Sequence, residues 1–429
     1  MARSKSFPDS VDPGMPVLPA CPSGWAQRKF GDVLRAIERP IALDEEMTYT
    51  LVNAKRSRGG IVLRDRKPGK EVKVPTQFIV REGDFVISRR QIIHGACGIV
   101  PRDLDGAIVS NEYLVLNSTD ELSTKYLSYF SHTPYFQRTC FHSSVGVDVE
   151  KMVFKEDQWF QFPFPLPPLP EQKKIAAILS SVDETIAKTE AVIAQLQIVK
   201  KAMMEQLLTK GMPGRHTRFK QTEIGEIPEE WEVVELGSVG EWLSGGTPSK
   251  SDPHLWAGSV PWVSPKDMKR PRLGDAEDHV HEDAIGNGTR LVPADTLLMV
   301  VRGMILAHTF PVCLTTASVT FNQDIKALRP SVHFEPEFLL YWLQGSQSRV
   351  LEITEVANHG TKRIPTEQLH AMGVPLPSLP EQQGIVHAIR SLEVLIGKTT
   401  DEKRELQAVK SSLSSSLLSG EIRVIPEVA

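Results

Sequence analysis

The chain has 429 residues, of which 41% are hydrophobic and 24% are charged, and its formal net charge is -4. This composition predicts a soluble, cytoplasmic protein of two to four domains, and no apolar run approaches the roughly 20 residues that a membrane-spanning helix needs. The acidic balance excludes a globally basic nucleic-acid-binding protein, so any DNA-binding surface must be local. The four cysteines lie far apart and form no Cys-x-x-Cys pair, which argues against a disulfide framework or a zinc knuckle.

The beginning of the chain, residues 1–23, contains no apolar stretch of signal-peptide type, and we expect a disordered leader there. A block of mixed strand-like and helix-like patterns follows over 24–164, and a second block of similar length spans 228–374. The two blocks begin alike, because Trp25 is followed by Phe-Gly-Asp-Val and Trp231 by Leu-Gly-Ser-Val. This likeness suggests one duplicated module whose middle part has diverged.

A proline-rich lead-in and a helical segment follow each block, and they repeat at a spacing of 210 residues. PLPPLPEQKKIAAIL begins at Pro165 and PLPSLPEQQGIVHAI begins at Pro375, and 18 of the 45 positions aligned from there are identical. An internal repeat of this length implies that the protein consists of two similar halves.

Both repeats continue with the heptad pattern of a coiled coil for more than four heptads. Pro170 suits the first turn of a helix and Glu171 complements the positive end of the helix dipole. In the second copy, Gly384 and Gly397 should each weaken the helix by about 1 kcal/mol relative to alanine. The predicted seam consists of Ile175, Leu179, Val182, Ile186, Thr189, Ile193, Leu196, Lys200, Met203 and Leu207, and of Ile385, Ile389, Leu392, Ile396, Thr399, Lys403, Leu406, Lys410, Leu413 and Leu417.

These patterns predict an α+β protein with two α/β-type blocks and two helices, each about 60 Å long, that pair as an antiparallel coiled coil. Because the linker after the first helix is short, we expect the second block at the far end of that helix, with pseudo-two-fold symmetry between the halves. The predicted boundaries are a leader at 1–23, block one at 24–164, helix one at 165–212, a linker at 213–227, block two at 228–374, helix two at 375–420 and a tail at 421–429.

The duplicated PLPxLPEQ unit resembles the specificity subunit of a type I restriction–modification system. SGGTPSK at 244–250, LWAGSVPWVSPKDM at 255–268 and LLSGEIRV at 417–424 add to this resemblance, which extends from about Trp25 to Val424. It implies that each block is a target recognition domain that reads half of a bipartite sequence in double-stranded DNA. It also implies that the helices set the gap between the half-sites and dock two methyltransferase subunits; whether two restriction subunits join is left open.

The same resemblance implies that the chain itself holds no cofactor. S-adenosylmethionine would bind in the partner methyltransferase subunit, and ATP and Mg would bind in the restriction subunit if one is present. Pro170, Glu171 and Gln172, with their counterparts Pro380, Glu381 and Gln382, are expected to present one partner-binding surface twice, although such residues also commonly start helices.

Local positive charge marks the candidate DNA contacts, although charge runs are usually solvated faces. Residues 55–73 carry eight basic and two acidic side chains, and a strand-like run precedes arginines that could pair with guanine. In the second block the candidates are scattered. The predicted DNA-binding residues are Lys55, Arg56, Arg58, Arg64, Arg66, Lys67, Arg89, Arg90 and His94 in the first block, and Lys266, Lys269, Arg270, Arg272, Arg302, Lys362 and Arg363 in the second.

The sequence predicts no catalytic and no metal site. Ser249 replaces a phosphate-loop glycine in SGGTPSK and Pro248 removes a backbone N–H, His279-x-His281 lacks a third ligand at metal-site spacing, and no amino-methyltransferase tetrapeptide is present. We therefore expect a non-catalytic DNA-recognition scaffold. Two alternatives stay open: a stand-alone restriction or modification enzyme, and a coiled-coil adaptor with no role on DNA.

Overall fold

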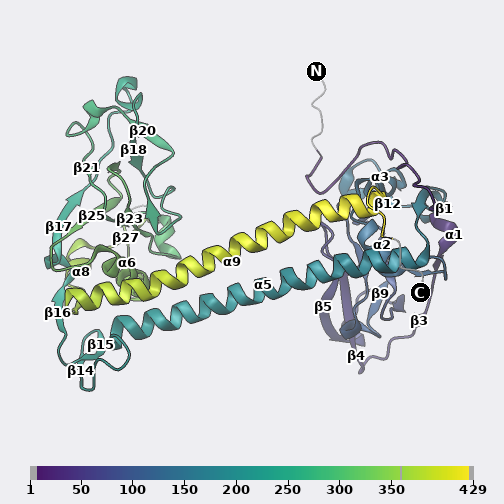
Figure 1. The fold of residues 1–429 in the computed structure, drawn as a ribbon, viewed down its shortest axis with the longest axis horizontal. Coiled ribbons are helices and arrows are strands. Elements are labelled where there is room, and N and C mark those ends of the chain that lie inside the picture. The colour runs from purple at the N-terminus through teal and green to yellow at the C-terminus, as the bar shows by residue number, and fades with distance from the viewer. Residues whose placement is uncertain (1–6, 358–359, 425–429) are drawn as a thin grey trace. The chain divides into compact units, whose positions relative to one another are not determined.

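A computed structural model describes residues 7–357 and 360–424. The chain divides into two compact units: unit 1 comprises Met1–Glu190 and Asp401–Ala429, and unit 2 comprises Ala191–Thr400. Each unit contains one globular block and parts of two long helices, α5 (Leu169–Lys210) and α9 (Leu379–Ser419) (Figure 1). Among the helices of the described residues, none is long and apolar enough to cross a membrane.

The proline-rich lead-ins form strands, and the helices begin at Leu169 and Leu379, within the segments bounded at 165 and 375 in the sequence. In unit 1, β13 (Pro163–Leu166) pairs antiparallel with β1 (Ala26–Lys29), the strand that opens the block. In unit 2, β28 (Gly373–Leu376) pairs in the same way with β16 (Glu232–Glu235). Each block is therefore closed by a pairing between its first strand and its last.

The two long helices pack antiparallel within each unit, as predicted. In unit 1, Lys410 Nζ lies 2.5 Å from Asp183 Oδ1 and Lys403 Nζ lies 3.4 Å from Glu190 Oε1. The later residue of α5 thus contacts the earlier residue of α9, so the two helices run in opposite directions. In unit 2, Lys200 Nζ lies 2.6 Å from Glu393 Oε1. All the predicted seam positions are buried or half-buried, which confirms the heptad pattern in both helices.

The block of unit 1 contains two largely antiparallel sheets with short helices packed against them. One sheet consists of β2 (Leu34–Ala36), β10 (Tyr113–Ser118), β7 (Phe85–Ser88) and β8 (Cys97–Ile99), and the other of β3 (Pro40–Ile41), β6 (Gln77–Ile79), β9 (Ile108–Ser110), β4 (Thr48–Ala54) and β5 (Ile61–Pro68). The helices are α1 (Phe30–Val33), α2 (Thr124–Phe130), α3 (Pro134–His142) and α4 (Glu156–Trp159), and β11 (Ser144–Val145) pairs with β12 (Val153–Phe154). Aromatic side chains fill the core, and Phe30 stacks on Trp159 and Phe164 with ring centroids 4.2 and 4.5 Å apart.

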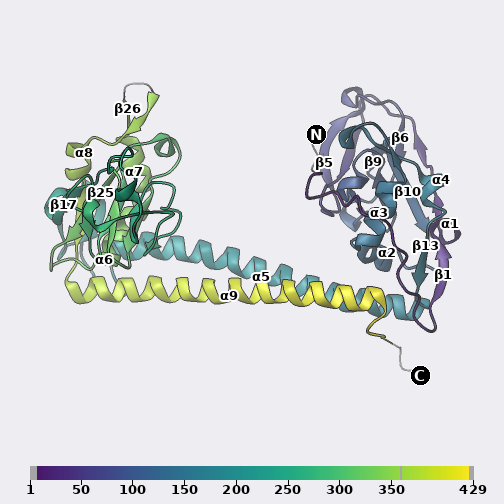
Figure 2. The same cartoon turned by 90° about the horizontal axis from the view of Figure 1, so that it is seen from above.

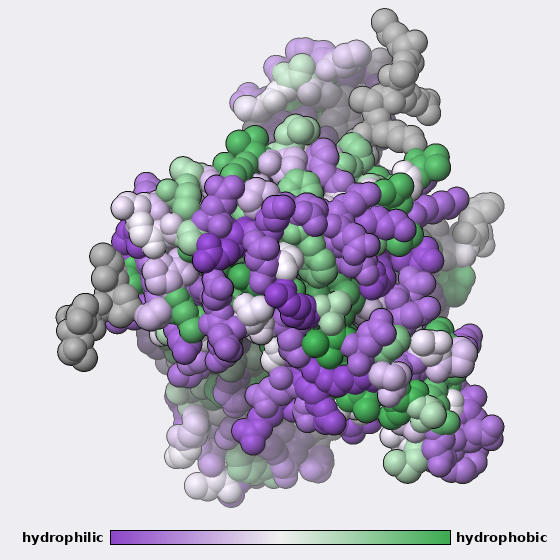
Figure 3. All heavy atoms as spheres, turned by 90° about the vertical axis from the view of Figure 1, so that its right-hand side faces the viewer, coloured by the Kyte–Doolittle hydropathy of each residue, from purple (hydrophilic) through white to green (hydrophobic). Residues whose placement is uncertain are grey.

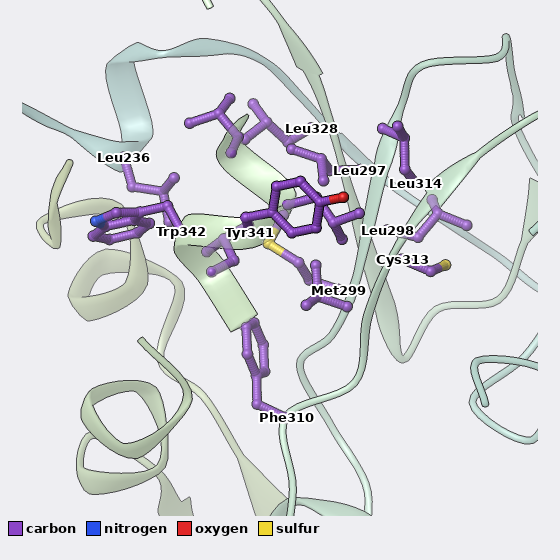
Figure 4. Close-up of a cluster of buried hydrophobic side chains, with 14 of the residues drawn as sticks. Leu236, Leu297, Leu298, Met299, Phe310, Cys313, Leu314, Leu328, Tyr341 and Trp342 are labelled. Carbon is purple, nitrogen blue, oxygen red and sulfur yellow. The ribbon is translucent and has the colours of Figure 1, made fainter. Parts of the chain in front are cut away.

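The block of unit 2 also contains a five-stranded and a four-stranded sheet. The first consists of β17 (Gly240–Ser244), β25 (Ile325–Pro330), β22 (Leu297–Val300), β23 (Val312–Thr315) and β19 (Arg272–Leu273), and the second of β20 (Asp278–Val280), β18 (Val260–Val263), β24 (Val319–Phe321) and β21 (Leu291–Val292). The helices are α6 (Pro336–Gly345), α7 (Gln347–Glu352) and α8 (Thr366–His370). Tyr341 and Trp342 of α6 belong to a buried cluster that includes leucines of the first sheet and Leu236 (Figure 4).

The leader and the linker are more ordered than the sequence indicated. Residues 7–23 of the leader pack on unit 1 instead of being disordered: Val11 is buried, and Asp12 accepts hydrogen bonds from Arg138 Nε at 2.9 and 3.0 Å. The linker at 213–227 contains most of a hairpin, formed by β14 (Phe219–Thr222) and β15 (Gly225–Pro228). Short polar segments gave no hydrophobic periodicity from which either feature could be predicted.

The glycines of α9 do not interrupt the helix. A Cβ atom added at Gly397 would meet no atom within 4 Å, so Gly397→Ala should raise the free energy of unfolding by about 0.5–1 kcal/mol through lower backbone entropy of the unfolded chain. Gly211 ends α5 with a φ of +76°, and its added Cβ would lie 2.7 Å from His216 and Glu381. Gly211→Ala should therefore destabilise the protein, and thermal melts in which Gly397→Ala also lowers the midpoint would contradict this prediction.

Candidate nucleic-acid interface

A buried carboxylate at the start of α5 holds unit 1 together. Glu171 accepts hydrogen bonds from Trp25 Nε1 at 3.2 Å and from two nitrogens of Arg423 at 2.8 and 2.9 Å. Burial alone would raise the pKa of Glu171, but the hydrogen bonds from Arg423 and the Val424 N–H outweigh it and hold the pKa below its ordinary value. The carboxylate thus joins the first strand of the block, the helix start and the segment that follows α9.

Unit 2 repeats this arrangement with different partners. Glu381 accepts from Trp231 Nε1 at 3.2 Å and contacts His216 Nε2 at 2.7 Å, and Arg215 lies 3.5 Å away. The likeness of the two block openings in the sequence is thereby explained, because the tryptophan after each opening turn binds the glutamate of the same unit.

The expectation that Glu171, Gln172, Glu381 and Gln382 face a partner was wrong. All four side chains are buried, and both glutamines bind their own unit. Gln172 accepts from the Ser123 N–H at 2.8 Å and donates to two carbonyls, and Gln382 makes the equivalent bonds in unit 2. A buried polar group is costly unless it is paired, so these side chains serve the fold. Pro170 and Pro380 are exposed.

The basic run of the first block lies on the β4–β5 hairpin and the segment that follows it. A β-bulge opposite Leu51 and Val52 leaves Arg64 outside the regular pairing, and bulges commonly redirect a side chain. Arg64, Lys67 and Lys73 line a hollow of about 250 Å³. Arg66 is exposed nearby.

Several members of the run are engaged with other side chains. Lys67 lies 3.0 Å from Asp65, and Arg56 bonds Gln91 and Glu150, each at 2.6 Å. Lys55 and Arg58 are exposed at the hairpin turn, where Arg58 has a φ of +63°. The face shown in Figure 3 is mostly hydrophilic, with hydrophobic side chains in small patches.

The segment around residue 90 differs from the prediction. Arg89 is half-buried and forms an ion pair with Glu156, so its guanidinium is held by the protein rather than offered to a base. Arg90 is exposed and pairs with Glu112 at 2.5 Å; such an exposed pair is weak and can be exchanged for another anion. His94 is fully buried, its Nδ1 lies 2.8 Å from Ser10 Oγ, and burial lowers its pKa. His94 was therefore wrongly predicted to contact DNA.

In unit 2 the fold brings together three of the scattered basic residues. Lys362 and Arg363 form β27 (Lys362–Arg363), which pairs with β26 (Glu355–Val356) in a hairpin that projects from the unit (Figure 2). The Gly303 N–H donates to the Lys362 carbonyl at 2.9 Å, and the backbones of Arg302 and Arg363 form an isolated antiparallel β-bridge. Arg302 and Arg363 are exposed, and Arg363 lies 3.4 Å from Glu355, so this edge brings three cations together beside one carboxylate.

The other four candidates of unit 2 divide into two kinds. Lys269 and Arg270 are exposed, and no ion pair joins either of them to another described residue. Lys266 is paired with Asp278 and Glu277 at 2.9 and 3.0 Å, which raises its pKa. Arg272, with 27% of its side chain exposed, bonds Glu337 and Glu393 at 2.8 and 2.9 Å.

The guanidinium of Arg272 is therefore held by carboxylates of its own unit. It also donates to the Tyr341 hydroxyl at 2.9 Å, so it ties α6 to α9. A single sequence contains no sign that a basic residue beside exposed ones will be drawn into such a network.

Residues 22–197 and 228–408 match the family model described as type I restriction modification DNA specificity domain. The chain belongs to this DNA specificity family. The two matched stretches correspond to the two block-and-helix repeats, which confirms the resemblance seen in the sequence.

Relatives in the DNA specificity family include two specificity subunits of type I restriction enzymes. That of EcoR124I/EcoR124II from Escherichia coli is 31% identical over 248 residues, or 56% of this chain and 57% of the relative. That of MjaVIII from Methanocaldococcus jannaschii is 26% identical over 436 residues, or 94% of each chain. The chain thus spans little more than half the length of the first relative and nearly all of the second.

Solved structures share the fold. The HsdS subunit from Thermoanaerobacter tengcongensis has a TM-score of 0.51 at 18% identity, covering 94% of this chain and 98% of its own. A chain from a study of complex assembly and conformational transition in the type I R-M system has a TM-score of 0.62 at 18% identity, covering 94% and 100%. These likenesses support the α+β fold with two long helices.

Two side chains that anchor the units were not predicted from the sequence as functional. Arg423 and His216 lie in short segments just after α9 and α5 and bind the buried glutamates. The spacing of 210 residues aligns Arg423 with Pro213 rather than with His216, so the repeat gave no signal for these two side chains.

Arg272 provides a direct test of the distinction between structural and DNA-binding cations. Arg272→Ala leaves Glu337 and Glu393 without their shared cation, and we expect the free energy of unfolding to fall by about 2 kcal/mol or more. Arg270→Ala is the matched control, because Arg270 is exposed and should change stability by less than about 0.5 kcal/mol. Equal denaturation midpoints for the two variants would show that the Arg272 network does not stabilise the fold.

Proposed function

We propose that this chain is the DNA-recognition subunit of a type I restriction–modification complex and that each of its blocks reads one half of a bipartite target. The observation that carries the proposal is the repeated unit: two divergent blocks, each anchored to a helix start by an equivalent buried glutamate, within a DNA specificity family. Two different readers on equivalent supports suit two different half-sites separated by unread base pairs.

The exposed and half-buried cations of the two blocks supply the DNA contacts in this proposal. In unit 1 they are Lys55, Arg58, Arg64, Arg66 and Lys67 on the β4–β5 hairpin. Arg90 joins them by exchanging its ion-pair partner Glu112 for a DNA phosphate. In unit 2 they are Arg302, Lys362 and Arg363, with Lys269 and Arg270. Lysine and arginine contacts to phosphate give affinity, whereas bidentate arginine contacts to guanine give sequence preference.

The chemistry of the complex would then belong to partner subunits in the cytoplasm. We infer two methyltransferase subunits, one for each repeat, that bring S-adenosylmethionine, and restriction subunits that would bring ATP and Mg. The exposed Pro170 and Pro380 stand at equivalent helix starts and are candidate contacts for such a repeated partner. The two helices would hold the readers at a fixed spacing, which suits a target with a constant gap.

The salt dependence of DNA binding tests this assignment. In the complex with its methyltransferase partner, Arg64→Ala/Arg66→Ala should lower affinity roughly 10–100-fold and reduce the slope of log K against log salt by about two, because each phosphate contact contributes about 0.9. The readout is fluorescence anisotropy on a DNA duplex that carries the sequence that the methyltransferase partner modifies.

The matched control is Arg28→Ala/Arg218→Ala, which removes the same charge from exposed pairs with Glu121 and Glu229, outside the basic surfaces. Affinity and slope should stay near those of the unmodified protein. If both double variants lose affinity equally, net charge rather than the β4–β5 surface governs binding, and the assignment is wrong.

A further inference from the structure

Three potential metal ligands meet at the surface of unit 2, at a place unrelated to the basic edge. His254 lies in η6 (Pro253–Trp256), and His281 and Asp283 lie at the start of η7 (Glu282–Ala284). One ligand atom from each lies within 4.8 Å of the others. His254 Nε2 is 3.0 Å and His281 Nδ1 is 3.3 Å from the same carboxylate oxygen of Asp283.

The backbone beneath this cluster is held in place from both sides. Asp252 Oδ1 accepts from the His254 N–H at 3.1 Å, and the His281 N–H donates to the Leu255 carbonyl at 2.9 Å, which ties the two segments together. A small apolar core lies under them, formed by Leu255, Trp262, Val280 and Ala284. The three side chains are thus presented by a fixed support, which is what a binding site needs.

The spacing of the donor atoms suits a tetrahedral ion. Zinc–nitrogen and zinc–oxygen bonds of about 2.0–2.1 Å place ligand atoms on one ion roughly 3.3 Å apart, and the two distances to the Asp283 oxygen are 3.0 and 3.3 Å. His281 Nδ1 also accepts a hydrogen bond from the Asp283 N–H at 3.2 Å. Because this hydrogen bond is long and exposed, water could replace His281 as the partner of the N–H. Two imidazoles and one carboxylate favour zinc and similar transition metals over Mg²⁺ or Ca²⁺, which prefer oxygen ligands.

The charge around the cluster favours a cation. Residues 275–283 contain five carboxylates and no lysine or arginine. His279, two residues before His281, bonds Asp275 instead and stands outside the cluster.

We propose that His254, His281 and Asp283 form a binding site for one divalent transition-metal ion, with zinc as the best fit and water in the fourth position. The ion would pin η6, which follows the SGGTPSK segment, to the end of β20. The spacing of His279 and His281 in the sequence shows no third ligand because that ligand comes from His254, in another segment of the chain.

Titration calorimetry of the untagged full chain with ZnCl₂ at neutral pH tests the site. We expect one saturable site, at least tenfold weaker binding in His254→Gln and in Asp283→Asn, and unchanged binding in the control His279→Gln. MgCl₂ should give no comparable heat. Because the three substituted side chains are exposed or half-buried, the variants should fold, and their thermal melts without zinc should match the unmodified chain.

Cobalt substitution adds a readout that depends on geometry. Co²⁺ bound by the unmodified chain and by His279→Gln should show the visible absorption of a tetrahedral ion, and His254→Gln should not. Equal zinc affinity in His254→Gln and His279→Gln, or no saturable binding by the unmodified chain, would overturn the proposal.

Discussion

The buried carboxylate at the start of each long helix is the interaction on which both units depend. A carboxylate removed from water is costly unless its partners are close and well oriented, and each unit supplies a tryptophan N–H and a second polar side chain from separate parts of the chain. In unit 1 the partners are Trp25 and Arg423, and in unit 2 they are Trp231 and His216. Block, helix start and returning segment are thereby fastened at one point.

A second equivalent set of contacts joins each block to the long helices, further from the helix start. The Tyr129 hydroxyl bonds Asp183 at 2.9 Å in unit 1, and the Tyr341 hydroxyl bonds Glu393 at 2.9 Å in unit 2. Lys410 and Lys200 complete the two sites from the opposite helix. Because the blocks meet the helices through the same few groups, the rest of each block can diverge without loosening its support. That separation suits a protein whose reading surfaces vary while its framework stays constant.

The features predicted well from the sequence depend on periodicity and repetition. The seam of α5 and α9, the helix ends near Gly211 and Gly420 and the likeness of the block openings are all local or repeated patterns, which a single chain displays directly. The lead-in prolines were harder to place, because extended residues before a helix can also pair as strands, as β13 and β28 do.

The destination of a charged side chain could not be predicted, because it depends on contacts between distant segments. Arg89, Arg272 and His94 resemble exposed basic residues in the sequence, yet the fold gives them Glu156, Glu337 and Ser10 as partners. Glu171 and Glu381 were misjudged for the same reason. Conversely, Arg302 and Arg363 are 61 positions apart and form one edge only after folding.

The central claim is that two independently anchored blocks read two halves of one DNA target. Replacing residues 30–160 with the corresponding block of another family member keeps Trp25, Glu171 and Arg423, and therefore keeps the anchor of unit 1. Sequencing of methylated bases in a host that carries the hybrid and its methyltransferase partner measures the outcome directly. The account predicts that one half-site changes while the other half-site and the gap persist, and a hybrid that changes both halves, or neither, would contradict it.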